Sequence, residues 1–377
     1  MLYWLLFEKL QPVFGPFRLF GYVTFRTAFA LITALLISLL LGPWMIRKLR
    51  AMAIGQFIRE DGPKSHETKA GTPTMGGLLI VVSILVPTLL WANLRNVQIW
   101  IAIGSLIGFG AIGFYDDYTK LKKMRNLGLT AKQKFLLQVL VAMAIGFVLL
   151  LLNAKSMYST SMNVPFFKAF RPDLIVDALA HNPWTFALAF APFYIFMILV
   201  LVGSTNAVNL TDGLDGLAIG LMIIASSAMT ALCYLGGHRE FATYLELERV
   251  PGASELTIFC STMVGASLGF LWFNAHPAEV FMGDVGSLAL GGSMGTVAVL
   301  IKQELLLPFI GGVYVIELLS VVLQVGSYKL RGKRIFKMAP IHHHFEMLGW
   351  KESKVIARFW IMGLIMALFA LATLKLR

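Results

Sequence analysis

Charged side chains are scarce in this chain of 377 residues. Aspartate, glutamate, lysine and arginine make up 14% of it, whereas a soluble domain has about 25%. Hydrophobic residues make up 58%, and apolar runs of about 20 residues, long enough to cross a bilayer as a helix, recur along the whole length. We therefore predict an all-α, polytopic integral membrane protein.

The chain also lacks the marks of a barrel, of a soluble domain and of a disulfide framework. Short segments of alternating polarity are absent, which argues against an outer-membrane barrel. No polar stretch is long enough to bury a core of its own, so we predict one transmembrane domain over residues 1–377. The two cysteines, Cys233 and Cys260, both lie in apolar segments, and no disulfide is expected.

Ten apolar segments are predicted to span the membrane, and the charge of their connections predicts how they are oriented. The segments are 22–46, 74–94, 97–115, 134–152, 186–205, 215–235, 256–273, 286–301, 305–325 and 355–374. Nineteen of the 32 lysines and arginines follow the first, third and ninth segments. Because cytoplasmic loops are rich in lysine and arginine, the odd-numbered connections are predicted to be cytoplasmic and both termini periplasmic.

The predicted cytoplasmic loops cover about 47–73, 116–133, 206–214, 274–285 and 326–354. They account for the formal net charge of +12 without a nucleic-acid partner. If 286–301 and 305–325 formed one re-entrant unit, the last loop would move to the other side.

Unusual polar clusters fall in these predicted loops, and Asp116-Asp117 is the first. Adjacent helical residues project about 100° apart, so one acid can bind a metal or act as a base while the other orients a neighbour. The simpler interpretation is a solvated helix end balanced by Lys120, Lys122 and Lys123, although the helix dipole disfavours acids at a C-terminus.

Four polar residues, Asn206, Asn209, Asp212 and Asp215, recur every three positions. On a helical turn this spacing brings amides and carboxylates near one face. Amides can bind a base or ribose, and carboxylates can accept from sugar hydroxyls or hold a hydrated cation. A helix cap is the alternative, but a cap explains only one of the acids.

Asp284 lies between glycines just before an apolar segment, and Asn274 precedes it in the same loop. A helix N-terminus there would favour an anion, or Asp284 could cap the helix itself. Lys69 similarly precedes a glycine-rich helix start, although the spacing is not that of a Walker A motif.

Three consecutive histidines, His342 to His344, lie in the last cytoplasmic loop. Histidine is a common metal ligand, but consecutive histidines cannot all bind one ion with good geometry, so zinc is not expected. We favour the interpretation that these histidines donate hydrogen bonds to a phosphate group, with the neighbouring lysines and arginines adding positive charge. Binding of lipid headgroups by the same basic cluster is the alternative.

Aspartates, amides, lysines and histidines on one membrane face suit phosphate chemistry with Mg²⁺. Nearly the whole chain resembles the phospho-N-acetylmuramoyl-pentapeptide-transferase family, within the polyprenyl-phosphate N-acetylhexosamine-1-phosphate transferases. The resemblance is carried by SHETKAGTPTMGG, GFYDDYTK, NAVNLTDGLDGLA, GFLWFNAHPAEVFMGDVGSLALGG and MAPIHHHFEMLGW. The last of these motifs resembles the muramoyl branch in particular.

The resemblance implies that undecaprenyl phosphate attacks the β-phosphate of UDP-N-acetylmuramoyl-pentapeptide and releases UMP. It further implies Mg²⁺, a site on the cytoplasmic face of the bacterial inner membrane, and a homodimer. By motif match, Asp284 would ligate Mg²⁺, Asp116 or Asp117 would deprotonate or orient the lipid phosphate, and His342 would lie beside the phosphates. The implied substrate-binding residues are Lys69, Thr74, Asn206, Asn209, Asp212, Asp215, Asn274, Phe281, His343 and His344.

Two other functions fit the same residues. One is a sister transferase that uses another UDP-N-acetylhexosamine. The other is an ion-coupled transporter, because buried acids in glycine-broken helices also occur in carriers, although carriers hold them near the bilayer midplane. Direct attack and an aspartyl-phosphate intermediate both remain open.

Overall fold

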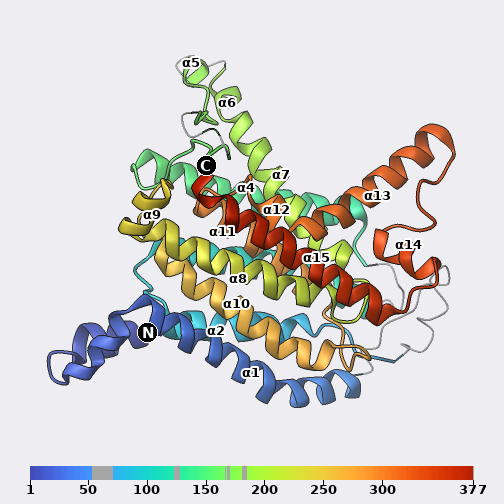
Figure 1. The fold of residues 1–377 in the computed structure, drawn as a ribbon, viewed down its shortest axis with the longest axis horizontal. Coiled ribbons are helices and arrows are strands. Elements are labelled where there is room, and N and C mark those ends of the chain that lie inside the picture. Colours follow the sequence, from blue (N-terminus) through green and yellow to red (C-terminus); the bar gives the residue numbers. More distant parts are fainter. Residues whose placement is uncertain (53–70, 123–127, 166, 168–169, 181–184, 377) are drawn as a thin grey trace.

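The computed structural model describes residues 1–52, 71–122, 128–165, 167, 170–180 and 185–376, which contain ten long helices and no β-strand (Figure 1). The long helices are α1 Val23–Ala51, α2 Gly77–Trp91, α3 Val97–Lys122, α4 Ala131–Ala154, α7 Ala191–Thr211, α8 Leu217–Gly237, α10 Ala253–Asn274, α11 Gly283–Leu300, α13 Gly312–Arg331 and α15 Glu352–Ala372. The short ones are η1 Tyr3–Leu10, η2 Gly15–Gly21, α5 Asp177–Ala180, α6 Phe186–Ala189, α9 Arg239–Leu245, α12 Leu307–Ile310, α14 Ile341–Met347 and η4 Thr373–Leu376.

Each predicted apolar segment overlaps one of the ten long helices, and the all-α polytopic prediction is confirmed. Nine of the ten helices in the described residues are long and apolar enough to cross a membrane, and α2 is a shorter apolar helix of 15 residues. Such helices satisfy every backbone polar group internally, which a bilayer core requires.

Several predicted helix ends were wrong in the same direction. Helix α3 continues beyond 115 to Lys122, and α7 continues beyond 205 to Thr211. Helix α11 begins at Gly283 instead of 286. In each case polar residues that were predicted to lie in a loop are helical. Neighbouring helices provide hydrogen-bond partners for their side chains, and a pattern of apolar residues along the sequence does not reveal such partners.

Helices α10 and α11 form the centre of the bundle. Buried residues make up 83% and 89% of their apolar windows, against 22% in α13. Helix α11 packs against α3 and α7, and α10 packs against α1 and α8. Small residues allow this close packing: a side chain at Gly291 would collide with the backbone of α7.

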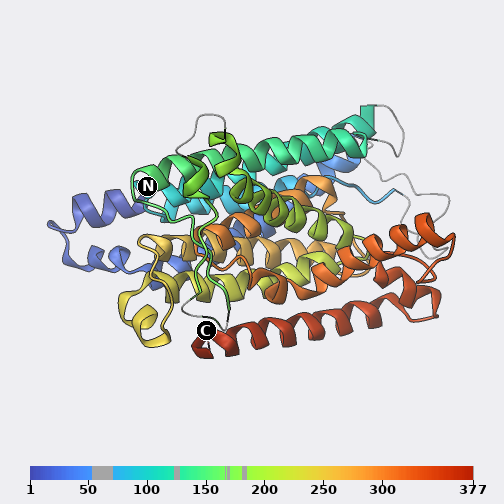
Figure 2. The same cartoon turned by 90° about the horizontal axis from the view of Figure 1, so that it is seen from above.

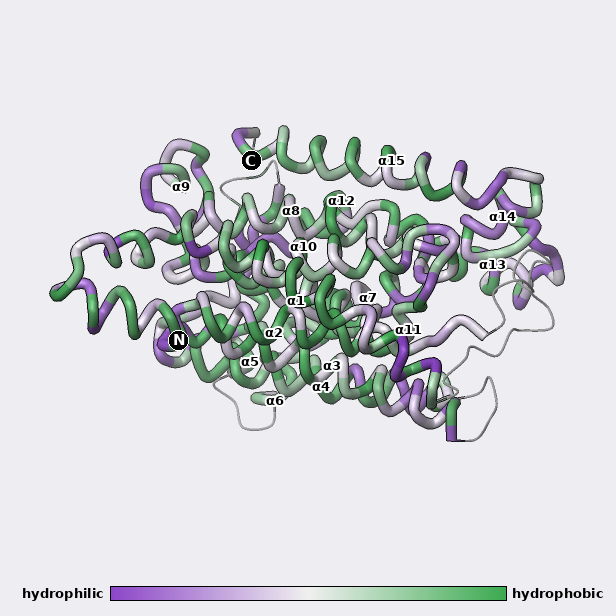
Figure 3. The backbone as a smooth tube through the Cα atoms, turned by 90° about the horizontal axis from the view of Figure 1, so that it is seen from below, coloured by the Kyte–Doolittle hydropathy of each residue, from purple (hydrophilic) through white to green (hydrophobic). Residues whose placement is uncertain are grey.

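Both chain termini lie at one end of the bundle, together with α9, whereas α14 and the start of α15 lie at the other end (Figures 1 and 2). Figure 3 shows hydrophilic residues gathered around α14 and the adjoining ends of α11 and α13. We call this the α14 end. It carries all the aspartates and histidines that the sequence singled out.

A buried ion pair joins α1 to α10 near the end where the termini lie. Arg26 donates to both carboxylate oxygens of Glu255, at 2.8 and 2.6 Å, and to the carbonyl of Trp91 at 3.2 Å. Glu255 also accepts from the backbone N–H of Asn93 at 2.9 Å. These hydrogen bonds connect the pair to α1, α10 and the end of α2 and offset part of its desolvation, although Nε of Arg26 has no hydrogen-bond partner among the described residues.

We predict that Glu255→Gln destabilises the fold, because it leaves the Arg26 guanidinium buried without a counter-charge. Breaking such a pair costs about 3–5 kcal/mol, and the melting temperature in detergent should fall by roughly 10 °C. The control is Glu8→Gln, which removes the partner of the exposed Arg95 and should change little. Equal melting temperatures for Glu255→Gln and wild type would contradict this role.

Candidate active site

Three aspartates from two helices meet at the α14 end. Asp116 and Asp117 lie in the last two turns of α3, and Asp284 lies in the first turn of α11. Each offers a carboxylate oxygen, and these oxygens all lie within 4.8 Å of one another. Asp116 and Asp117 are each only 3% exposed. The sequence predicted both motifs, and the structure brings them together.

Two glycines make this convergence possible. A side chain at Gly113 would collide with the backbone of Asp284, so only glycine lets α3 approach α11 so closely. Gly283 has φ +71°, a left-handed conformation that starts α11, and its Cα faces Asp117 and the hydroxyl of Thr74. Thr74 therefore borders the acidic cluster.

Lys120 lies at the centre of the three aspartates. Its Nζ is 2.7 Å from Asp116, 3.2 Å from Asp117 and 2.8 Å from Asp284. From the sequence, Lys120 was predicted only to balance the charge at a helix end. Its spacing from the two aspartates could have indicated this role, because residues three and four positions apart share one face of a helix.

A second lysine approaches from α4. Lys134 Nζ lies 3.0 Å from Asp284 and donates to the side-chain oxygen of Asn209 at 3.1 Å. Asn209 in turn donates to Asp284 at 2.6 Å and to Ser287 at 2.8 Å. Lys134 was missed as a site residue, since no local pattern links α4 to α11.

Backbone groups hold the aspartate pair in place. Asp116 accepts from the N–H of Leu129 at 2.7 Å, and Asp117 accepts from the N–H of Val285 at 3.3 Å. The two carboxylates are thus oriented by different segments, although both contact Lys120. This arrangement fits two acids that project differently from one helix.

Asn206 points toward α4, away from the contacts that Asn209 makes. Its amide donates to Gln138 at 2.7 Å and to the carbonyl of Val202 at 2.8 Å. Asn206 and Asn209 lie inside α7, not in a loop at 206–214 as predicted. The polar pair Asn206–Gln138 explains why this turn stays helical.

Asp212 caps the C-terminal end of α7, where other acids lie nearby. Burial, followed by the charges of Asp284 and Asp117, raises the pKa of this carboxyl from its usual value of 3.8 to about 8. Among the described residues no lysine or arginine forms an ion pair with it. Additional positive charge would therefore stabilise the ionised form.

Asp215 and Asn274 make a different set of contacts. Asp215 lies 3.0 Å from Nδ1 of His276, and its backbone N–H donates to Glu352 at 3.0 Å. Asn274 accepts from the N–H of Gly216 at 3.0 Å. These contacts join the α7–α8 loop to the α10–α11 loop, so both residues shape the site's border.

The three histidines have three separate surroundings. His342 is fully buried, with Nδ1 3.1 Å from Glu317 of α13. His343 pairs with Glu346 at 2.7 Å, and His344 accepts from the N–H of Lys337 at 3.1 Å. Of the three, His342 reaches the site loop: a side chain at Gly213 would collide with its Nε2.

Phe281, which precedes α11, contacts the segment that leads into α2. The backbone of Phe281 pairs with Pro73 at 2.8 Å and with Gly76 at 2.9 Å, which holds the N-terminus of α2 beside α11. Lys69 lies outside the described residues.

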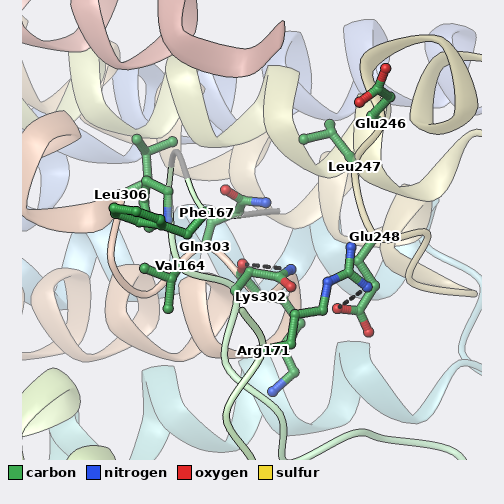
Figure 4. Close-up of a pocket in the computed structure, with 11 residues that line it drawn as sticks. Val164, Phe167, Arg171, Glu246, Leu247, Glu248, Lys302, Gln303 and Leu306 are labelled. Carbon is green, nitrogen blue, oxygen red and sulfur yellow. Dashed lines mark hydrogen bonds and ion pairs between the residues drawn. The ribbon is translucent and has the colours of Figure 1, made fainter. Parts of the chain in front are cut away.

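A second polar region lies at the opposite end of α11, about 27 Å from Asp284 for a helix of this length. There a small cavity of about 40 Å³ is lined by Arg171, Glu248, Lys302 and Gln303, among others (Figure 4). Its charges are paired, with Arg171 3.8 Å from Glu248 and Lys302 3.7 Å from Glu304. Unlike the site at Asp284, this region does not bring several acids together around shared lysines in the part of the chain that the structure describes.

The acidic cluster has the donor set that a hard divalent cation requires. It supplies three carboxylates, and Mg²⁺ prefers oxygen ligands. In the structure the Lys120 ammonium lies where these oxygens converge, which shows that the position attracts positive charge. Three acids contact two lysines, and Asp212 nearby has no cationic partner among the described residues, so the residues fit a divalent cation.

These observations define a polytopic membrane protein with an acidic, lysine-bordered site of the kind used in phosphate chemistry. The Glycosyl transferase family 4 model matches residues 99–302, and phospho-N-acetylmuramoyl-pentapeptide-transferase signature 1 matches residues 69–81. The chain is 64% identical to phospho-N-acetylmuramoyl-pentapeptide-transferases of Solibacter usitatus and Koribacter versatilis and 53% identical to that of a Geobacter species. These matches cover 99–100% of this chain and 100% of each relative. The chain therefore belongs to the phospho-N-acetylmuramoyl-pentapeptide-transferase family.

We predict that Asp212 makes the cation-free protein less stable as pH rises. Its pKa is raised to about 8 by burial and neighbouring acids, so the folded state holds a proton that the unfolded chain releases at much lower pH. Stability contributed by that proton is present at low pH and is lost as pH rises toward 8. With EDTA present, Asp212→Asn should therefore melt about 3 °C or more above wild type at pH 8, with a smaller gap at pH 5.

The control for this measurement is Asp173→Asn, which lies at the other end of the bundle. An unchanged dependence of melting temperature on pH in Asp212→Asn would contradict the assignment.

Proposed function

We propose that this protein transfers phospho-N-acetylmuramoyl-pentapeptide from UDP to undecaprenyl phosphate, with Mg²⁺, at the cytoplasmic face of the bacterial inner membrane. The supporting observation is the convergence of Asp116, Asp117 and Asp284 on two lysines at one end of an apolar bundle. Such a site can hold the diphosphate of a soluble nucleotide beside the headgroup of a lipid.

In the proposed reaction, an oxygen of the lipid phosphate attacks the β-phosphorus of the donor. The bond from that phosphorus to the oxygen bridging it to the α-phosphate breaks, and its electron pair leaves with UMP. A phosphate monoester loses its last proton near pH 6, so the attacking oxygen is largely ionised at neutral pH. We therefore favour direct attack over an aspartyl-phosphate intermediate.

The acidic and basic residues of the site would have different roles in this reaction. Asp284, with Asp116 and Asp117, would hold Mg²⁺, which supplies charge neutralisation for the diphosphate when bound. Lys120 and Lys134, displaced from the acids, would balance charge on the phosphates as the bond breaks. Asn209 and Thr74 border the same space and could donate to phosphate or ribose oxygens.

An apolar cavity offers a place for the lipid chain. It has a volume of about 210 Å³, is almost wholly apolar and lies between α7 and α13. Leu199, Val200 and Gly203 line one side, and Val315 and Leu318 line the other. Ala207, in the same cavity, adjoins Asn206 of the site, so a chain lying here would bring its phosphate toward Asp284.

The orientation is proposed from charge. The loops at the α14 end are the lysine- and arginine-rich ones, and cytoplasmic loops have this bias. The same end holds the acids in the first turn of α11 and the last turns of α3. This location favours an enzyme over an ion-coupled carrier, whose acids lie near the midplane.

The test of this function is transfer in oriented membrane vesicles. We expect inverted vesicles, which expose the cytoplasmic face, to convert added UDP-N-acetylmuramoyl-pentapeptide to a lipid product with release of UMP. Sealed right-side-out vesicles should not, because the donor cannot cross the bilayer. Preference for UDP-N-acetylglucosamine would overturn the substrate, and equal activity in both orientations would overturn the sidedness.

We predict that Asp284→Asn lowers kcat by about three orders of magnitude or more, because it removes a charged ligand and with it charge stabilisation at the reacting phosphate. The protein should still fold, since Asn keeps the shape of the side chain. Transfer and melting temperature are measured together, with Glu248→Gln as the control. Activity above a tenth of wild type would rule out Asp284 as the metal ligand.

A further inference from the structure

Glu317 is a carboxylic acid in the second turn of a membrane-spanning helix. It lies in α13, among apolar residues, and its side chain has no exposed area. An ionisable group at such a place is costly and is normally retained for a function. No part of the proposed reaction described above uses it.

The neighbour of Glu317 is the one buried histidine of the triplet. Oε2 of Glu317 lies 3.1 Å from Nδ1 of His342, and neither side chain is exposed. The two residues come from α13 and α14, which are joined by the loop at the α14 end. Burial of both partners makes their interaction strong, because little water screens it.

The other nitrogen of His342 faces the site. A side chain at Gly213 would collide with Nε2, so this atom lies against the backbone between Asp212 and Leu214. Within the described residues neither ring nitrogen has hydrogen-bond geometry to a partner: Nδ1 has the close contact with the Glu317 carboxylate, and Nε2 has no polar partner although it is buried. A buried nitrogen without a partner is costly, which suggests that a ligand completes it.

Helix α13 is itself anchored to the start of α8, which follows the same loop. One turn before Glu317, the hydroxyl of Tyr314 donates to the carbonyl of Ala218 at 2.6 Å. Glu317 and Tyr314 therefore share the buried face of α13 that meets the start of α8. The position of the carboxylate relative to Gly213 is fixed by the fold.

We propose that Glu317 is a positioning residue for His342. Its carboxylate keeps the proton of the imidazole on Nδ1 and orients the ring, so that Nε2 is presented at Gly213 to an oxygen of the donor's diphosphate. A carboxylate that orients an imidazole in this way is a recurring device at reactive sites. The proposal rests on the proposed function, because it takes the diphosphate to lie at this loop.

A double-mutant cycle tests the proposal against a purely structural role. Glu317→Gln keeps the shape of the side chain but removes its charge, and its amide can donate to Nδ1. We expect kcat to fall at least 30-fold, with KM for the UDP-linked donor changed by less than threefold. His342→Gln should show a similar loss, and the double variant should lose no more than threefold beyond His342→Gln alone.

The matched control is Ser320→Ala, one turn further along the buried face of α13, where the hydroxyl donates only to the carbonyl of Glu317 at 2.7 Å. Its kcat should stay within threefold of wild type. Additive losses in the double variant, or a kcat that falls only in step with melting temperature, would overturn the positioning role.

A spectroscopic measurement separates failure of this proposal from failure of the proposed function. In protein labelled with ¹⁵N-histidine, the His342 signals, assigned by their loss in His342→Gln, should show a proton on Nδ1 in wild type. In Glu317→Gln that proton should move to Nε2. Identical nitrogen shifts in the two proteins would overturn the proposal, and this readout holds even if another substrate were the true one.

Discussion

The interaction on which the site depends is the contact of one ammonium group with three carboxylates. Packing of α3 on α11 at Gly113 forces Asp116, Asp117 and Asp284 together. Two like charges about 4 Å apart repel by roughly 4 kcal/mol near a protein surface, so the helices could not pack this way without positive charge between them. Lys120 supplies it, and Lys134 adds a second charge at Asp284.

The two lysines do not balance all the acids at the site, and the remaining negative charge allows the site to bind a cation. Asp212 remains without a cationic partner among the described residues, and its pKa is raised by burial and by the acids around it. A site with this surplus can take up a divalent cation, and a cation so held can in turn bind phosphate. Helix packing, charge balance and the proposed chemistry are therefore parts of one arrangement.

The sequence predicted those features that are local. Apolar length predicted ten spanning helices, and loop charge grouped the aspartates and histidines at one end, where the structure also has them. The helix ends were less predictable, because Asn206 and Asn209 look like loop residues until Gln138 and Asp284 are seen to bind them. Lys134 was missed for the same reason, since its contacts join α4 to segments far away in sequence.

The three consecutive histidines also show that contacts between distant segments cannot be predicted from local sequence. Three adjacent identical residues cannot be told apart by composition, yet they end up in three surroundings because a short helix turns each ring in a different direction. Only His342 is fully buried and faces Glu317, and no pattern joins a carboxylate in an apolar helix to a histidine 25 positions later. Tertiary packing assigned that role.

Buried charge alone does not identify a site in this fold, as the two ends of α11 demonstrate. At the far end Lys302 is 3% exposed, but its ammonium has the Tyr158 hydroxyl and Glu304 beside it. Arg171 and Glu248 likewise pair with each other there. At the near end three acids contact two lysines and Asp212 has no cationic partner among the described residues, and these acids come from α3, α11 and the end of α7. The difference lies in the balance of charge and in convergence from distant segments, and both properties point to the α14 end as the place where a cation and a phosphate would bind.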